Sequence, residues 1–313
     1  MTLAVAEQID RLRKNINRVF VGKAEVTETV LIGLLAEGNL LIEDLPGVGK
    51  TVLAKALARS IDCNFSRIQF TPDLLPSDIL GVSIYNAARG EFTFKPGPIF
   101  SNVVLADEIN RATPRTQSSL LEAMNEGHVT VDGVTHPLAK PFLVIATQNP
   151  LEYEGTFPLP ESQLDRFLMR IRIGYPNRDQ ERRILVEQKL VHPLESLKPT
   201  LTGADVVALQ HRVREAKVEP PVMDYVLEII ARTRQDEGLE LGASPRAALN
   251  LTRAAQARAV LQDRDYTLPD DVKRLAEPVL LHRLVAKTGI GDSRNGNVSQ
   301  VLRHILNTVA VPL

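Results

Sequence analysis

The sequence predicts an α/β protein: a parallel sheet covered by helices on both faces, followed by an all-helical part. Five short apolar runs, at 40–42, 65–70, 103–106, 142–146 and 168–173, alternate with helical patterns. Continuous apolar strands separated by helices are typical of a parallel sheet that is buried on both faces. A glycine-rich loop joins the first run to a helix. From Asn177 onward the strand-like runs end, so we place the domain boundary there, with residues 1–176 and 177–313 as the two domains.

The bulk composition is that of an ordinary globular protein, with 44% hydrophobic and 24% charged residues among 313. The net charge of −1 provides no overall field to attract nucleic acid or an anionic membrane. Cys63 is the single cysteine, so no intramolecular disulfide forms and a reducing, cytoplasmic location is expected. No run approaches the ~20 apolar residues of a membrane span, and the N-terminus becomes charged too early for a signal peptide.

The first elements are two amphipathic helices, predicted at residues 4–17 and 25–37. Between them lies a turn containing Phe20, Val21 and Gly22. This turn has two readings: it packs over the base of a bound nucleotide, or it is a plain connection between helices.

The loop after the first strand has the features of a phosphate-binding loop. Glycines let backbone N–H groups turn toward phosphate oxygens, Lys50 supplies a cation, and Thr51 offers a hydroxyl to Mg²⁺ at the positive end of a helix. In this sequence Asp44 replaces the first glycine of the usual pattern GxxxxGK[ST]. The pattern therefore does not predict the conformation of the turn that enters the loop. The predicted nucleotide contacts here are Pro46, Gly47, Val48, Gly49, Lys50, Thr51 and Val52.

Two further segments predict β-hairpins that project from the sheet domain, or that merely cap the sheet. Residues 83–94 have strand-like ends around a central turn, and residues 127–138 alternate into Asp132-Gly133, a strong hairpin signal. The second domain is predicted to contain helices at 178–191, 203–217, 221–236, 245–262, 269–285 and 299–309. Thr202 with Asp205 forms a predicted capping box, and Ser244 a cap followed by proline.

Polar residues follow two of the buried strands. Asp107 and Glu108 come after 103–106, where an enzyme with a phosphate-binding loop holds magnesium and activates water. Asp107 would orient Mg²⁺, and Glu108 would act as general base. Asn149 follows 142–146, where its amide can reach a γ-phosphate or hold the water. It can equally be part of an Asn-Pro turn.

Two arginines stand out. Arg166 lies just before the last strand, after a short helical segment. Arg246 occupies the first turn of a predicted helix, where a cation opposes the helix dipole by roughly 0.3–1 kcal/mol. A role at a phosphate would explain that position, and pairing with a carboxylate such as Glu240 is the plain alternative.

Taken together, these motifs resemble the AAA+ ATPases, and more closely the MoxR family. The resemblance covers essentially the whole chain and is densest in LLIEDLPGVGKT, VVLADEINRATPRTQSSLLEAMNEGHVTVDG, VIATQNPLEYEGTFPLPESQLDRF and GASPRA. It implies a sheet of strand order 5-1-4-3-2, a helical lid and a ring of usually six subunits. It also implies ATP with Mg²⁺ as ligands and a chaperone-like action on other proteins. Partners in the family often carry von Willebrand factor A domains, and some members aid metal insertion.

The resemblance assigns roles to residues of this chain. Lys50 and Thr51 match Walker A, Asp107 and Glu108 Walker B, and Asn149 sensor 1. Arg166 matches the arginine finger and Arg246 sensor 2. The hairpins match the helix-2 insert and the hairpin before sensor 1.

Three hypotheses follow: a ring motor that hydrolyses ATP to remodel a protein partner, a DNA-acting motor, and a nucleotide-gated binding module with little turnover. A DNA motor needs basic and aromatic groups on the inserts, and these offer Arg89, Lys95, Phe92 and Phe94 beside Glu91. The acidic pair argues against the binding module. We therefore expect a protein partner and no specific nucleic acid.

Overall fold

The computed structural model describes residues 5–88, 90–150, 155–187, 193–287 and 294–312. At its centre lies a five-stranded parallel sheet of order β2-β5-β8-β1-β9. Counted along the chain among these five strands and read from the other edge, this is the expected order 5-1-4-3-2. Each predicted apolar run forms one strand: β1 (Leu40–Glu43), β2 (Phe65–Gln69), β5 (Val103–Asp107), β8 (Leu143–Gln148) and β9 (Met169–Ile171).

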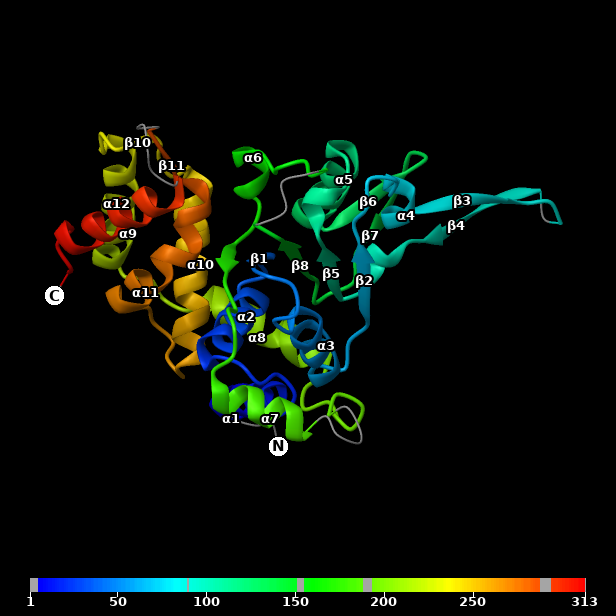
Figure 1. Cartoon of the computed structure of the whole chain (residues 1–313), viewed down its shortest axis with the longest axis horizontal. Coiled ribbons are helices and arrows are strands. Elements are labelled where there is room, and N and C mark those ends of the chain that lie inside the picture. Colours follow the sequence, from blue (N-terminus) through cyan, green and yellow to red (C-terminus); the bar gives the residue numbers. More distant parts are fainter. Residues whose placement is uncertain (1–4, 89, 151–154, 188–192, 288–293, 313) are drawn as a thin grey trace.

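Alternating side chains of the strands enter two separate apolar clusters, one on each face of the sheet. Leu40 and Ile42 pack into the cluster that contains α1 (Val5–Asn17), α2 (Ala24–Leu35) and α3 (Lys50–Ser60). Leu41 packs into the other, with α4 (Pro76–Leu80) and α5 (Pro114–Glu126). Figure 1 shows these helices below and above the sheet. Because both faces are covered, the central strands β1, β5 and β8 are mostly apolar, as the sequence predicted, whereas the edge strands β2 and β9 also carry Arg67, Gln69 and Arg170.

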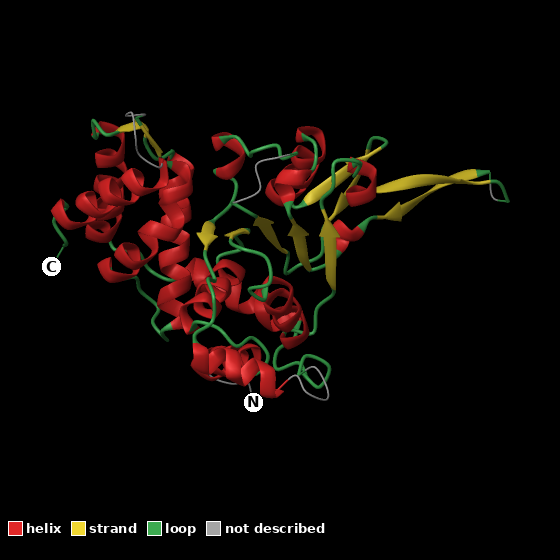
Figure 2. Cartoon of the chain, in the orientation of Figure 1, coloured by secondary structure: helices red, strands yellow, loops and turns green. Residues whose placement is uncertain are grey.

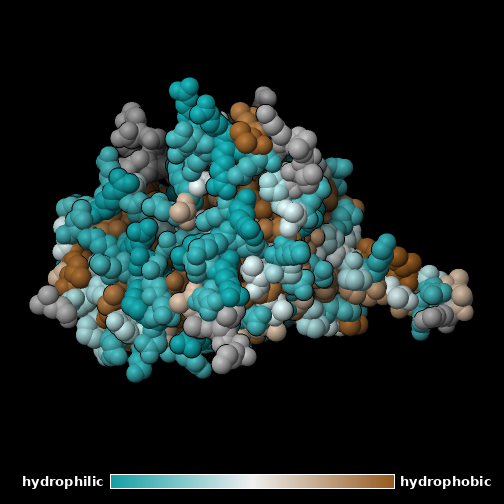
Figure 3. Space-filling model, turned by 90° about the horizontal axis from the view of Figure 1, so that it is seen from below, coloured by the Kyte–Doolittle hydropathy of each residue, from teal (hydrophilic) through white to brown (hydrophobic). Residues whose placement is uncertain are grey.

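Both predicted hairpins form. The first consists of β3 (Gly81–Asn86) and β4 (Glu91–Pro96), and the second of β6 (His128–Val131) and β7 (Val134–Pro137). Asp132 and Gly133 both have positive φ, as a two-residue hairpin turn requires. The first hairpin extends well beyond the body of the molecule (Figure 2), and Figure 3 shows apolar atoms along it. Arg89 lies outside the described residues.

The second half of the chain is built mainly from helices. They are α7 (Arg178–Glu187), α8 (Gly203–Glu215), α9 (Pro220–Gln235), α10 (Pro245–Leu261), α11 (Pro269–Leu280) and α12 (Arg294–Thr308), with a 3₁₀ turn η3 (Leu281–Arg283) after α11. Residues 188–191 of the first predicted helix lie outside the described residues. The predicted caps form: Thr202 accepts a hydrogen bond from Asp205 N, and Ser244 from Ala247 N.

The expectation of an all-helical second part is wrong in one place. β10 (Leu239–Leu241) and β11 (Val285–Ala286) pair as an antiparallel two-stranded sheet. Strands of three and two residues are too short to show an alternating pattern. Val285 was predicted as the end of a helix, but α11 stops at Leu280.

The helical part is packed firmly against the sheet domain. Gln210 on α8 donates to the carbonyl of Leu34 on α2 (2.7 Å), and buried residues of α8 to α12 belong to the same apolar cluster as Leu40. The relative placement of the two parts is therefore set by a continuous core. No helix in the described part of the chain is long and apolar enough to cross a membrane.

Candidate nucleotide-binding site

The glycine loop has the conformation that its sequence predicts. Gly47 and Gly49 have φ values of 82° and 91°, which side chains disfavour, and α3 begins directly after Gly49. Thr51 thus lies in the first turn of α3, with Lys50 before it. The Lys50 ammonium donates to the carbonyl of Asp44 (2.7 Å), so its side chain folds back over the loop. The first N–H groups of a helix have no acceptor within the helix, so the start of α3 suits an anion.

Asp44, which replaces the usual first glycine, ties the loop to the neighbouring strand. Its carboxylate is largely buried and accepts from the N–H groups of Ile173 and Gly174 (2.6 Å each) and of Leu45 (2.8 Å). The Asp44 side chain therefore links the end of β1 to the segment that leaves β9. The sequence showed that a glycine was missing, and the structure shows what the carboxylate does there.

A cavity of 250 Å³ lies beside the loop. Residues 19–23, 47–49 and 173–176 form most of its wall. Gln180 of α7 donates to the carbonyl of Gly22 (3.0 Å) and so holds the turn over the cavity. Val21 and Gly22 thus lie where an adenine ring could contact them, next to Gly49 and Val52.

The acidic pair lies at the carboxyl end of β5 and is fixed by Thr147 at the end of β8. The buried Thr147 hydroxyl donates to Asp107 Oδ1 (2.6 Å) and accepts from Glu108 N (2.9 Å). Glu108 has φ 57°, a left-handed conformation that is rare for a side-chain-bearing residue. Strained backbone of this kind is often found at functional sites.

Sequence reasoning missed Thr147 and three further polar neighbours of the pair. Arg67 on β2 donates to Asp107 Oδ2 through Nε and Nη2 (3.0 and 2.6 Å). Gln69 and Arg111 donate to Glu108 Oε2 (2.8 and 3.1 Å). The register of β2 on β5 places Gln69 directly opposite Asp107. These hydrogen bonds orient the Glu108 carboxylate. Before Glu108 can accept a proton from water, the water must replace one of these donors.

The residues present fit a magnesium ion. Thr51 and Asp107 offer oxygen donors, which Mg²⁺ prefers. No group of three or more His, Cys, Asp or Glu side chains able to hold a metal occurs within the described ranges. A site of one carboxylate and one hydroxyl suits an ion that takes its remaining ligands from water and phosphate oxygens. Asn149, buried at the end of β8, follows Thr147 by two residues.

Neither Arg166 nor Arg246 lines this cavity. Arg166 points toward the end of α5, where its Nε and Nη1 lie 3.3 and 3.0 Å from the Asn125 side-chain oxygen once that amide is oriented to accept. Arg246 is exposed at the start of α10, and within the described part of the chain it forms no ion pair with Glu240. The structure therefore does not support the pairing with Glu240, and the role of Arg246 stays a prediction.

Cys63 is a packing residue and not a nucleophile. Its thiol packs against the apolar core, and burial, with the charge of Asp62 adding to it, raises its pKa to about 11. A thiol with this pKa stays protonated and weakly reactive at neutral pH.

Comparisons with known proteins identify the family. Residues 39–169 match the ATPase family associated with various cellular activities (AAA), and residues 231–304 match the AAA lid domain. The chaperone MoxR1 of Mycobacterium tuberculosis is 42% identical over 99% of this chain and 84% of its own length. The chain belongs to the MoxR family of AAA+ ATPases.

Other comparisons also cover nearly the whole chain. The protein MoxR of Methylorubrum extorquens is 30% identical over 96% of this chain and 94% of its own. The uncharacterized protein YeaC of Bacillus subtilis is 51% identical over 96% and 93%. A crystal structure from Cytophaga hutchinsonii, of a protein suggested to be an ATPase, superposes with a TM-score of 0.90. It is 37% identical and covers 99% of this chain and 96% of that one. The MoxR-family fold is thus shared along the full length.

Proposed function

We propose that this chain hydrolyses ATP with Mg²⁺ and uses the energy, as a ring of six subunits, to remodel a protein partner. The proposal rests on one observation: the residues that follow three neighbouring strands lie at the same edge of the sheet. The phosphate-binding loop follows β1, the Asp107–Glu108 pair follows β5, and Thr147 and Asn149 follow β8. Because β1, β8 and β5 are neighbours, these groups lie at one edge of the sheet, where ligands of parallel sheets bind.

Each residue has a proposed role in that reaction. Lys50 and the loop N–H groups bind the phosphates, while Thr51 and Asp107 hold the magnesium ion. The ion neutralises charge on the phosphate oxygens when it is bound. Glu108 accepts the proton of the attacking water, and Asn149 orients that water or a γ-phosphate oxygen. Arg166 and Arg246 act as arginine finger and sensor 2. Residues 1–176 form the nucleotide-binding domain and residues 177–313 the lid.

A protein partner is favoured over nucleic acid. The relative from Mycobacterium tuberculosis is named a chaperone. The projecting hairpin exposes Ile84, Tyr85 and Phe92, which suit an apolar polypeptide segment. The partner that we propose carries a von Willebrand factor A domain. Salt-sensitive DNA binding at physiological salt tighter than the roughly 10⁻⁴–10⁻⁶ M of non-specific binders would contradict this part.

The ATPase assignment is tested with two variants. Lys50→Ala should lose most nucleotide affinity, because it removes the cation facing the phosphates. Glu108→Gln should bind ATP normally but hydrolyse it at least about 10²-fold more slowly, because it removes only the base. Fluorescent-nucleotide titration and phosphate release measure the two effects. Hydrolysis by Glu108→Gln at the parent rate would show that Glu108 is not the base.

A further inference from the structure

The segment that carries Arg166 is held from the lid. Its own helix, α6 (Glu161–Leu164), has four residues, none of them buried, and Asp165 caps its end. A helix this short does not fix its own orientation. The geometry of Arg166 therefore depends on what holds Asp165.

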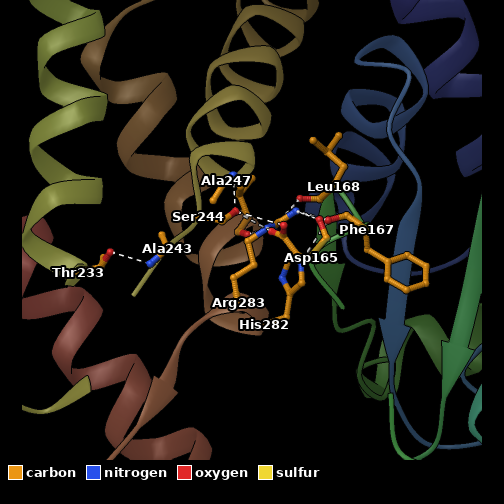
Figure 4. Close-up of polar contacts among 10 residues, drawn as sticks. Asp165, Phe167, Leu168, Thr233, Ala243, Ser244, Ala247, His282 and Arg283 are labelled. Carbon is orange, nitrogen blue, oxygen red and sulfur yellow. Dashed lines mark hydrogen bonds and ion pairs between the residues drawn. The ribbon is translucent and has the colours of Figure 1, made fainter. Parts of the chain in front are cut away.

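Arg283 provides most of that hold. Its side chain is only 1% exposed and its Nε donates to Asp165 Oδ1 (2.8 Å). Its two Nη atoms donate to the carbonyls of Asp165 (3.1 Å), Leu168 (3.2 Å) and Phe167. One guanidinium thus bonds to residues before and after Arg166 in the chain. Figure 4 shows Arg283 beside Asp165, Phe167 and Leu168. The planar fork of arginine allows this, and lysine could not replace it.

Ser244 extends the contact to α10. Its hydroxyl caps the helix by accepting from Ala247 N (3.2 Å) and also donates to the Asp165 carboxylate (3.1 Å). Arg246 follows two residues later. The strand-like stretch before Ser244 is anchored to α9, because Ala243 N donates to Thr233 Oγ1 (3.0 Å; Figure 4). The first turn of α10 is therefore fixed to Asp165 on one side and to α9 on the other.

The cluster places a second cation, Arg246, near the buried Arg283. Burial lowers the pKa of Arg283, Asp165 opposes that shift, and the nearby Arg246 lowers it further. A second arginine beside a buried cation disfavours stability. Local arrangements that work against stability tend to occur at functional sites.

We propose that Asp165, Arg283 and Ser244 form a positioning clamp, which holds Arg166 and Arg246 in a fixed relation so that a movement of the lid shifts both arginines together. This inference rests on the proposed ATP hydrolysis. The three clamp residues are positioning residues, since none of them lines the cavity at the phosphate loop.

The mildest test is Ser244→Ala, which removes one hydroxyl from the clamp. A matched control is Thr202→Ala, because Thr202 caps α8 in the same way but does not contact Asp165. Ser244→Thr keeps the hydroxyl and serves as the rescue variant. Three quantities are measured for each variant: kcat of ATP hydrolysis, Kd for ATP, and hydrogen exchange of the amides of residues 165–167.

Ser244→Ala should lower kcat by about tenfold to 10²-fold, the effect of a small misplacement of a catalytic group, with Kd for ATP unchanged. Exchange at residues 165–167 should rise about tenfold, since a hydrogen bond to a charged group is lost. Thr202→Ala should change neither kcat nor the exchange at residues 165–167. Ser244→Thr should keep both at the values of the parent protein.

Equal kcat losses in Ser244→Ala and Thr202→Ala, or unchanged exchange at residues 165–167 in Ser244→Ala, would overturn the clamp. If the parent protein itself failed to hydrolyse ATP, the proposed function would fall. The exchange measurement would still decide whether Ser244 and Asp165 hold the finger segment.

Discussion

At the scale of single residues, Asp44 shows how a departure from a motif can serve the site. A glycine at this position would keep the backbone bond to Gln148 but would have no side chain to accept hydrogen bonds from the segment after β9. The Asp44 carboxylate instead satisfies the N–H groups of Ile173 and Gly174, at the start of the segment that walls the nucleotide cavity. The loop that would bind phosphate and the wall that would meet the base are therefore held together by one side chain.

The importance of Asp44 is tested with Asp44→Ala. The change leaves three N–H groups, those of Ile173, Gly174 and Leu45, without their acceptor, and the bond to Ile173 is buried. It should lower the free energy of unfolding by about 2–4 kcal/mol. ATP should bind more weakly as well, because the cavity wall is released. Asp78→Ala is the control, since Asp78 accepts a single, exposed N–H group and its loss should cost about 1 kcal/mol. Denaturant unfolding measures the stability of each variant, and nucleotide titration measures its affinity for ATP. Equal losses of stability and of affinity in Asp44→Ala and Asp78→Ala would refute the special role of Asp44.

At the scale of elements, the two hairpins are joined by aromatic rings. Phe94 of β4 stacks on His136 of β7, with ring centroids 4.0 Å apart and planes at 15°. Phe100 meets the Phe94 ring edge-on at 5.6 Å. Nearer the tip, Tyr85 and Phe92 contact each other at 5.3 Å and remain exposed. The inner aromatics thus couple the hairpins to each other, and the outer pair is left for a partner.

Phe94→Ala should uncouple the hairpins. An aromatic pair contributes about 0.5–1.5 kcal/mol, so amide exchange in residues 128–137 should speed up about 2- to 10-fold although the change lies in the other hairpin. Phe92→Ala, two residues away on the same strand, should leave exchange in residues 128–137 unaltered. Hydrogen exchange read by mass spectrometry separates the two. The idea fails if both variants behave alike.

The sequence was most informative where a pattern is local. The five strands, both hairpins and the caps at Thr202 and Ser244 are each visible in a short window of residues. The pairing of β10 with β11 was not predictable, because neither strand is long enough to show a period. Asp165 and Arg283 are 118 residues apart, and Gln69 meets Glu108 across a strand pair. Contacts of this kind depend on tertiary packing, which a single sequence does not display.

At the scale of the whole molecule, the position of Arg166 bears on how the site is completed. Arg166 contacts Asn125 at the end of α5 and does not line the cavity beside the phosphate loop. From there we expect it to serve the pocket of a neighbouring subunit. An arginine supplied in trans contributes about 10³–10⁵ in rate by neutralising charge in the transition state. A monomer should then be nearly inactive, and specific activity should rise with protein concentration as rings assemble.

Mixed rings test the sharing of sites directly. Arg166→Ala should bind ATP but not turn it over, and Lys50→Ala should lack a working pocket while keeping its finger. Mixing the two should restore part of the activity, since some interfaces then combine an intact pocket with an intact Arg166. Size measurement of the mixture establishes that subunits exchange. The control is the double variant Lys50→Ala/Arg166→Ala. Mixed with either single variant, it should restore no activity. Full-rate hydrolysis by a dilute, verified monomer would rule out a trans role, because Arg166 would then have to act on the ATP of its own chain.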